Sequence, residues 1–444
     1  MNGQEINQPD RNKFPTVAVL ILNWNGRSLL PISLPPLLAQ AYPHYEVVLV
    51  DNGSTDDSVA YVVEHFSQVN IIRLPENLGF ARGYNAAFKQ CQAEIVVLLN
   101  NDVIVQDDWL AEMIRPFSLD STIGTVGCKL LFPDGTIQHL GAQLSYPLAL
   151  SHHTAYRQPD TDQRDEITDT AYVTGAALAI PHALLASLDF FDEAFSPFYY
   201  EEVDLCYRVR AAGYRVVINS WAVGIHDEST SMRQVRSQKI HAYHKNRLHF
   251  VLKHYTPAQV LDDFVPAEQQ RLAHPTTAHE YHVLRRAYLE TAVAAADIPT
   301  HSLDPGQKRA IQHALLSLYR TAVAQEPAAH ELVADGWPQA ALAQQHALTE
   351  PDFRSDKPLI GPLIVAFRRL WHSIAGKWAL RQLMQQQNRF NALAARLFDE
   401  QYDRSETTAW EIELLSKELV RLQQTISQLQ QRLETVVQHS VNSH

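Results

Sequence analysis

The chain has 444 residues, of which 46% are hydrophobic and 19% are charged, and this composition excludes a wholly disordered protein. At about 100–200 residues per domain, the length predicts two or three structural units. The formal net charge is -12, from 37 Lys and Arg against 49 Asp and Glu, which disfavours a general affinity for nucleic acid across the surface.

The cysteines and the first residues favour a cytoplasmic protein. Cys91, Cys128 and Cys206 are odd in number and widely spaced, so they predict neither a disulfide framework nor a CxxC metal site. Residues 1–14 have no apolar segment after a basic start, so we expect a flexible N-terminus and no secretory signal. No later segment reaches the roughly 18 uninterrupted apolar residues of a membrane span.

Short apolar runs in the first half of the chain predict the strands of a mostly parallel sheet. They cover residues 17–22, 46–51, 70–74 and 94–99. The stretches between them, such as residues 29–40 and 56–66, have the pattern of helices. Strand and helix therefore alternate as in a doubly wound α/β domain.

After residue 255 the pattern becomes helical. Thr256-Pro257 and Asp304-Pro305 each place a capping side chain before a proline at the first helical position, which predicts a helical extension over 256–351. Residues 352–404 are predicted to hold a linker and an amphipathic basic helix. Its segment 363–381 is typical either of a helix that lies on a membrane surface or of one that packs against its own domain.

The clearest periodicity lies near the C-terminus. Apolar residues separated alternately by three and four positions form one seam, which predicts a coiled-coil helix over 405–438. They are Ile412, Leu415, Leu419, Leu422, Ile426, Leu429, Leu433 and Val436. The seam favours a homo-oligomer, and the alternative is a helix folded back onto its own chain.

Polar side chains follow several of the predicted strands. Asp51 ends the second strand, Asn100, Asn101 and Asp102 follow the fourth, and His226 ends an apolar run later in the chain. Ligands bind at the carboxyl ends of the strands in open α/β sheets, so Asp51 is a candidate for a ribose or base contact. Asp102 is a candidate ligand for Mg²⁺ or Mn²⁺ beside substrate phosphates. The alternatives are helix capping by the carboxylates and a structural role for the histidine.

A glycine-rich segment, residues 76–88, is a candidate anion site. Gly79 and Gly83 permit close backbone approach, and the helix expected there offers amide groups to an anion. Arg82 lies between these glycines and is a candidate diphosphate contact. Glycines are also common in ordinary turns, which is the alternative.

Carboxylates concentrate at the start of another predicted helix. Glu201, Glu202 and Asp204 lie there, where the helix dipole alone would favour negative charge. The dipole does not account for the aromatic residues 198–200 that directly precede them. A binding site approached by aromatic rings is therefore the second interpretation.

Taken in order, these segments resemble the inverting family 2 glycosyltransferases, particularly bacterial rhamnosyltransferase-like members. The resemblance covers about residues 15–255 and rests on VLILNWNG, VDNGSTDDS, NLGFARGYN, LLNNDV, VTGAALAI, FYYEEVDLCYRVR and GIH. It implies a GT-A fold, in which a Rossmann-like nucleotide-binding part merges into an acceptor-binding part.

The resemblance also implies roles for individual residues. Those implied to contact the nucleotide are Asn23, Trp24, Asp51, Asn77, Arg82 and Asn101. Asp102 and His226 would hold Mg²⁺ or Mn²⁺, although Asn100 stands where the family's metal motif usually has its first aspartate. Glu202 matches the acidic base of the family's Glu-Asp pair, with glutamate in place of aspartate. The residues implied to lie on the acceptor side or to support the site are Gly175, Glu201 and Asp204.

The sequence thus predicts a cytoplasmic inverting glycosyltransferase, peripheral at the inner face of the cell membrane if residues 363–381 bind lipid. Its expected partners are a nucleoside-diphosphate sugar, such as that of a deoxysugar like rhamnose, and a glycan or lipid-linked acceptor. One alternative is a non-catalytic coiled-coil assembly or glycan-binding protein. A sugar-nucleotide pyrophosphorylase is disfavoured, because NWNGRSLLPIS after the first strand is no glycine-rich, basic phosphate loop.

Overall fold

The computed structural model describes residues 14–160, 166–227, 236–274, 278–294 and 304–325. The predicted basic helix within 352–404 and the predicted coiled coil at 405–438 lie outside the described residues, as does nearly all of segment 1–14. The chain divides into two compact units, Met1–Gln270 with Ala294–Ala314 and Arg271–Val293 with Leu315–His444. The first unit therefore continues beyond residue 255.

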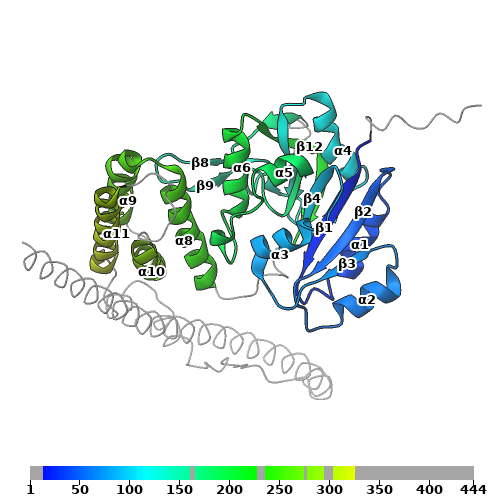
Figure 1. The fold of residues 1–444 in the computed structure, drawn as a ribbon, viewed down its shortest axis with the longest axis horizontal. Helices are drawn as coiled ribbons and strands as arrows, with labels where there is room; N and C mark the ends of the chain where they lie inside the picture. Colours follow the sequence, from blue (N-terminus) through cyan, green and yellow to red (C-terminus); the bar gives the residue numbers. More distant parts are fainter. Residues whose placement is uncertain (1–13, 161–165, 228–235, 275–277, 295–303, 326–444) are drawn as a thin grey trace, which may run out of the picture. The chain divides into compact units, whose positions relative to one another are not determined.

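A ten-stranded mixed sheet lies at the centre of the first unit (Figure 1). Its strand order is β10-β12-β6-β11-β4-β1-β2-β3, while β5 pairs with β12 and β7 pairs with β6. The strands are β1 (Val17–Asn23), β2 (Tyr45–Asp51), β3 (Asn70–Arg73), β4 (Ile95–Asn100), β5 (Val103–Val105), β6 (Ile123–Leu131), β7 (Ile137–His139), β10 (Ile167–Asp169), β11 (Ala177–Pro181) and β12 (Arg215–His226). The four strands predicted before residue 100 are confirmed.

The parallel strands end in register at one edge of the sheet. In the pairing of β1 with β2, Asn23 lies opposite Asp51, and in the pairing of β1 with β4, Leu22 lies opposite Asn100. Antiparallel β11 follows β4 in the sheet, and the short strand β5 runs antiparallel to the end of β12. The residues after β1, β2 and β4 therefore meet at the same edge.

The helices predicted between these strands are confirmed. The helices up to residue 211 are α1 (Leu30–Leu38), α2 (Ser58–His65), α3 (Gly79–Phe88), α4 (Trp109–Leu119), α5 (His182–Ser187), the short 3₁₀ helix η2 (Glu193–Phe195) and α6 (Glu201–Ala211). Leu34 of α1 and Trp109 of α4 pack on alternate residues of the central strands, such as Val19 and Val97. These strands are buried on both faces, which explains their continuous apolar runs.

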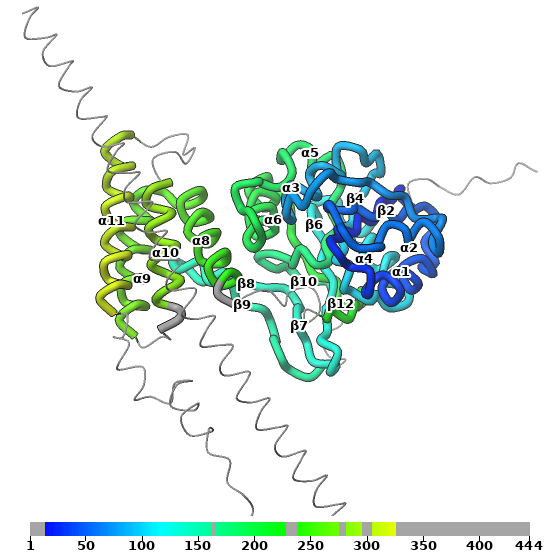
Figure 2. The backbone as a smooth tube through the Cα atoms, turned by 90° about the horizontal axis from the view of Figure 1, so that it is seen from below, coloured from blue at the N-terminus to red at the C-terminus, as the bar shows by residue number. Residues whose placement is uncertain are grey.

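Helix α8 (Arg236–His254) packs against the β8–β9 hairpin (Ala142–Leu144 and Ser151–His153). The Tyr243 hydroxyl of α8 accepts a 3.0 Å hydrogen bond from the Ser151 amide. Figures 1 and 2 both show the hairpin between the main sheet and α8. Arg247 of α8 donates to the Leu148 carbonyl and to Glu268 of α9 (Val265–Ala273), and the side chains of this ion pair are fully buried.

Both predicted proline-started helices are present. The Thr256 hydroxyl accepts from the amide of Gln259, where the π-helical turn η3 (Gln259–Phe264) begins. Before α11 (Pro305–Gln325), Asp304 accepts from the amides of Gly306 and Gln307. Helix α10 covers Ala278–Ala294, and no helix in the described ranges is long and apolar enough to cross a membrane. The three cysteines are free thiols.

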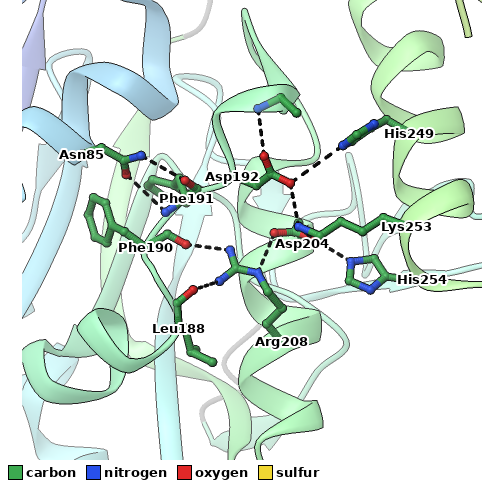
Figure 3. A network of polar contacts seen from close by, with 11 residues as sticks. Asn85, Leu188, Phe190, Phe191, Asp192, Asp204, Arg208, His249, Lys253 and His254 are labelled. Carbon is green, nitrogen blue, oxygen red and sulfur yellow. Dashed lines mark hydrogen bonds and ion pairs between the residues drawn. The ribbon is translucent and has the colours of Figure 1, made fainter. Parts of the chain in front are cut away.

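A network of buried charges ties α6 to α8 (Figure 3). Asp204 of α6 is 2.7 Å from each of Arg208 Nε, Lys253 Nζ and His254 Nε2. Arg208 also donates to the carbonyls of residues 188 and 190. Burial alone would raise the pKa of the Asp204 carboxyl, but the hydrogen bond from His254 and the charges of Arg208 and Lys253 lower its pKa below the ordinary value.

We predict that Asp204→Asn destabilises the first unit by about 3–5 kcal/mol at pH 7, because it leaves buried cations without their counter-charge. The folded pKa of Asp204 is lowered, so its contribution is complete above the ordinary carboxyl pKa of about 4 and is lost as the pH falls below it. Denaturant unfolding at pH 7 and at pH 3.5 measures both effects.

The matched control for this variant is Asp189→Asn. Asp189 is exposed and has a φ of 56°, a conformation that asparagine tolerates equally well. We expect this control to change the unfolding free energy by no more than about 0.5 kcal/mol. Equal stability of Asp204→Asn and the control would show that the network does not hold α6.

Candidate functional site

Side-chain hydrogen bonds join the loops that follow β1, β2 and β4. Asn101 Nδ2 donates to Asn23 Oδ1 at 2.9 Å, and Asn23 Nδ2 donates to Ser54 Oγ at 3.3 Å. A Cβ atom at Gly26 would lie 2.2 Å from Asn23 Oδ1 and 2.4 Å from Asn101 Nδ2, so only glycine fits at this position. The predicted residues Asn23 and Asn101 are therefore brought together.

Asp51 lies at the same edge and does not cap α2. Its Oδ1 accepts from the amide of Ser54 at 3.2 Å, whereas Asp57 occupies the N-cap position of α2. The next residue, Asn52, donates to Asn77 Oδ1 at 3.0 Å and to the carbonyl of Gly79. Asn77 is thereby fixed close to the end of β2, among the predicted nucleotide contacts.

Two predicted nucleotide contacts are more exposed. Trp24 follows β1 directly and is 45% exposed, which leaves its ring accessible. Arg82 lies on α3, where its Nε is 3.3 Å from Glu193 Oε2 and its side chain is 55% exposed. A diphosphate contact would therefore require the Arg82 guanidinium to exchange its bond with Glu193 for one with the ligand.

Asp102 and His226 meet because β5 pairs with the end of β12. Their Oδ1 and Nε2 atoms are 3.1 Å apart, and both side chains are buried. His226 Nδ1 lies 2.7 Å from Gln138 Oε1, and the amide nitrogen of Gln138 faces the His226 carbonyl. Since a glutamine oxygen only accepts, His226 Nδ1 donates to Gln138, which leaves Nε2 facing the Asp102 carboxylate.

This arrangement fits a divalent cation. An imidazole nitrogen and a carboxylate oxygen at this separation are favourable when a proton or a metal ion lies between them. A metal-binding histidine commonly donates its other ring N–H to a second group, as His226 does to Gln138. In the described part of the chain, His, Cys, Asp and Glu form no group of three or more that could hold a metal. Substrate oxygens and water would therefore complete the coordination of Mg²⁺ or Mn²⁺.

The carboxyls of Glu201 and Glu202 lie at the first turn of α6 in an environment that disfavours charge. Each has a buried Oε2 atom with no hydrogen-bond partner among the described residues. Burial raises the pKa of Glu202 to about 7. Burial and the neighbouring charge of Glu202 raise the pKa of Glu201 well above its ordinary value. Glu201 and Glu202 thus form a carboxyl pair in which burial favours the protonated forms.

Gly175 brings α3 close to the start of α6. A Cβ atom at Gly175 would lie 2.9 Å from Phe80 Cζ and 3.7 Å from the Cβ of Glu202. Of the three residues predicted on the acceptor side or as supports, Gly175 borders Glu202 in space and Glu201 precedes it in the chain. Asp204 instead belongs to the charge network of α6 and α8.

The structure adds residues near Glu202 that the sequence did not indicate. His139 Nε2 accepts from the amide of Thr174, which leaves its Nδ1–H directed at His153 Nδ1 at 3.1 Å. His153 Nε2 lies 3.3 Å from the Tyr172 hydroxyl, whose pKa is raised by burial and also by the charge of Glu202. Burial, with His153 and His226 nearby, lowers the pKa of His139 well below its ordinary value. These residues come from short strands and loops without a local sequence signal.

The chain is similar to two bacterial proteins over part of its length. It is 32% identical over 229 residues to the O-antigen biosynthesis protein RfbC of Myxococcus xanthus, covering 49% of this chain and 18% of that protein. It is 27% identical over 150 residues to the putative teichuronic acid biosynthesis glycosyltransferase TuaG of Bacillus subtilis (strain 168), covering 32% of this chain and 59% of that protein. The chain thus spans less than two thirds of the length of both relatives.

Solved structures show only a distant likeness. The crystal structure of GalNAc-T7 with UDP, GalNAc and Mn²⁺ is 16% identical, with a TM-score of 0.42 and coverage of 56% of this chain and 52% of that one. The structure of Staphylococcus aureus TarS 1-349 is 14% identical, with a TM-score of 0.43 and coverage of 72% and 92%. At these scores the likeness carries no argument.

The family comparison covers the part of the chain that forms the parallel edge. Residues 18–178 match the model of glycosyl transferase family 2. This range contains β1, β2 and β4 and ends within β11, so it includes Asn23, Asp51 and Asp102 but neither Glu202 nor His226. Residues 18–178, well under half of the chain, are therefore similar to glycosyl transferase family 2.

Proposed function

We propose that the chain is an inverting glycosyltransferase of GT-A fold that transfers a sugar from a nucleoside-diphosphate sugar to an acceptor hydroxyl. The family domain and the polar edge formed by Asn23, Asp51 and Asn101 support a nucleotide donor. The observation that carries the reaction is the buried carboxyl of Glu202, whose pKa is raised to about 7. A general base works best when its pKa lies near the working pH.

In the proposed reaction the acceptor oxygen attacks the anomeric carbon as the bond from that carbon to the diphosphate breaks. The proton of the acceptor hydroxyl passes to Glu202, and the electron pair of the broken bond leaves with the diphosphate. A single displacement of this kind inverts the anomeric centre. The raised pKa of Glu201 disfavours a second negative charge beside the base.

Donor binding is assigned to the carboxyl edge of the sheet. The Asp51 carboxylate is placed to accept hydrogen bonds from a ribose or base, and the exposed ring of Trp24 offers a surface for stacking. Asp102 and His226 would hold Mg²⁺ or Mn²⁺ beside the diphosphate. When bound, the cation would offset negative charge on the departing diphosphate.

The proposal extends to the acceptor and to the sugar that is transferred. Relatives are named for O-antigen and teichuronic acid biosynthesis, which supports a growing glycan or its lipid-linked precursor as the acceptor. A deoxysugar such as rhamnose is the proposed donor sugar. A glycan-binding protein without turnover is the rival, and release of free nucleotide diphosphate from a donor in the presence of acceptor extract separates the two.

We predict that Glu202→Gln lowers kcat by about 10²–10⁴-fold, because the amide cannot accept the acceptor proton. Nucleotide binding by calorimetry should stay within about twofold of wild type, since the lesion spares the donor site. In the wild type, kcat should rise with pH through an apparent pKa near 7, as Glu202 loses its proton. Glu64→Gln removes a charge from an exposed position of α2 and serves as the control. Wild-type kcat in Glu202→Gln would reject the assignment of the base.

We predict that Asp102→Ala removes the effect of Mn²⁺ on nucleotide binding. The substitution deletes the one carboxylate of the two proposed metal ligands, Asp102 and His226. Calorimetric titration of UDP, GDP and dTDP with and without Mn²⁺ measures this directly and requires no turnover. The wild type should bind its nucleotide at least tenfold more tightly with Mn²⁺. Asp134→Ala, at an exposed pair with Arg157, should keep the Mn²⁺ effect. A wild type indifferent to Mn²⁺ and Mg²⁺ would contradict the metal assignment.

A further inference from the structure

Helix α8 carries a buried amide that binds the chain directly before the catalytic turn of α6. Asn246 is fully buried, and its Nδ2 lies 2.8 Å from the carbonyl of Phe195 and 2.9 Å from the carbonyls of Phe198 and Tyr199. An amide nitrogen has two hydrogens, so three carbonyls share two donors. The segment before Glu201 is thus gathered around one side chain.

The backbone that Asn246 binds is strained. Tyr199 and Tyr200 have φ values of 75° and 71°, in the left-handed region that non-glycine residues rarely adopt. Tyr200 is the N-cap residue of α6 and makes no side-chain capping bond, although N-cap residues ordinarily have an extended backbone. Such a conformation persists only where surrounding contacts hold it.

The rest of the same face of α8 supports this turn. The ring of Tyr243 lies 6.1 Å from the ring of Tyr199 and 5.3 Å from that of Tyr200. Lys245 Nζ donates to the carbonyl of Ser196 at 2.9 Å. Further along α8, Lys253 and His254 bind Asp204, one turn beyond the start of α6 (Figure 3). Along α8, Asn246 lies between these residues, and its amide binds the carbonyl of the left-handed residue Tyr199.

Asn246 also carries an uncompensated polar atom. Its Oδ1 is buried and has no hydrogen-bond partner among the described residues. A buried acceptor of this kind reduces stability, and an apolar side chain would avoid that cost. The amide is therefore best explained by what its nitrogen holds in place.

We propose that Asn246 is a positioning residue for the Glu202 carboxylate: its amide holds the left-handed turn at Tyr199 and Tyr200, which sets the direction of the first turn of α6. The inference rests on the proposed function, because it assumes that Glu202 is the base. It extends the catalytic machinery to α8, which lies outside the matched range 18–178.

The test compares Asn246→Asp with Asn219→Asp in the full chain. Both asparagines are fully buried and donate from Nδ2 to a backbone carbonyl, but Asn219 donates to the carbonyl and to the Oε2 atom of Glu112 in α4. An ionised aspartate at 246 accepts only, so the three carbonyls lose their donor. We expect kcat to fall about 100-fold with the donor KM within about twofold, since small displacements of a catalytic group cost about this much. Asn219→Asp should keep kcat within about threefold.

Two further readouts separate positioning from simple loss of stability. The acid limb of the kcat profile should move to lower pH in Asn246→Ala, which adds no charge, because a displaced Glu202 gains water and its pKa falls towards the ordinary value. Hydrogen exchange of the peptide covering 196–205 should accelerate relative to Asn219→Asp, with no donor needed. Asn246→Ala provides a second variant if the aspartate prevents folding.

The outcomes also separate the inference from the proposed function. An active wild type that loses turnover in Glu202→Gln but keeps its kcat and pH profile in both Asn246 variants would overturn the positioning role alone. Unchanged hydrogen exchange in 196–205 would overturn it as well. A wild type that turns over no nucleotide sugar with any acceptor extract would reject the proposed function, and the positioning role would fall with it.

Discussion

The parallel register of β1, β2 and β4 is the constraint on which the site depends. Because Asn23 lies opposite Asp51 and Leu22 lies opposite Asn100, the polar residues after three separate strands reach one edge without long connections. A slip of register would change which side chains pack on each face of these buried strands and would also separate the polar residues at their ends. Packing of the core and placement of the polar edge are thus the same requirement.

Helix α6 shows how one element can hold carboxylates for opposite tasks. Asp204 faces Arg208, Lys253 and His254, which keep it charged and lower its pKa despite burial. Two residues earlier, Glu202 has no such partners, and burial raises its pKa to about 7. Carboxylates with diverging environments are how proteins separate structural or electrostatic roles from acid-base roles. The ion pairs of Asp204 fix the first turn of the helix, in which Glu202 has no counter-charge.

The sequence predicted the parts of the fold that depend on local pattern. Apolar runs indicated β1 to β4, and capping before proline indicated the helices that follow Thr256 and Asp304, because both signals act over a few residues. Asp102 and His226 were indicated by their places after apolar runs, but their 3.1 Å contact needed the antiparallel pairing of β5 with β12. His139 and Tyr172 had no local signal, since only tertiary pairing brings them near Glu202. The left-handed tyrosines were equally hidden, because no glycine marks the turn.

The change of pattern near residue 255 marks a change of secondary structure, and the compact unit continues to Gln270. The physical reason lies in the turn before α6. Two consecutive left-handed tyrosines cost roughly 1–2 kcal/mol each, so this turn needs an amide donor that holds its carbonyls. Helix α8 supplies that donor through Asn246 and is itself fixed by the buried pair of Arg247 with Glu268. The turn that carries the proposed base is therefore held by a helix that follows the sheet within the same compact unit.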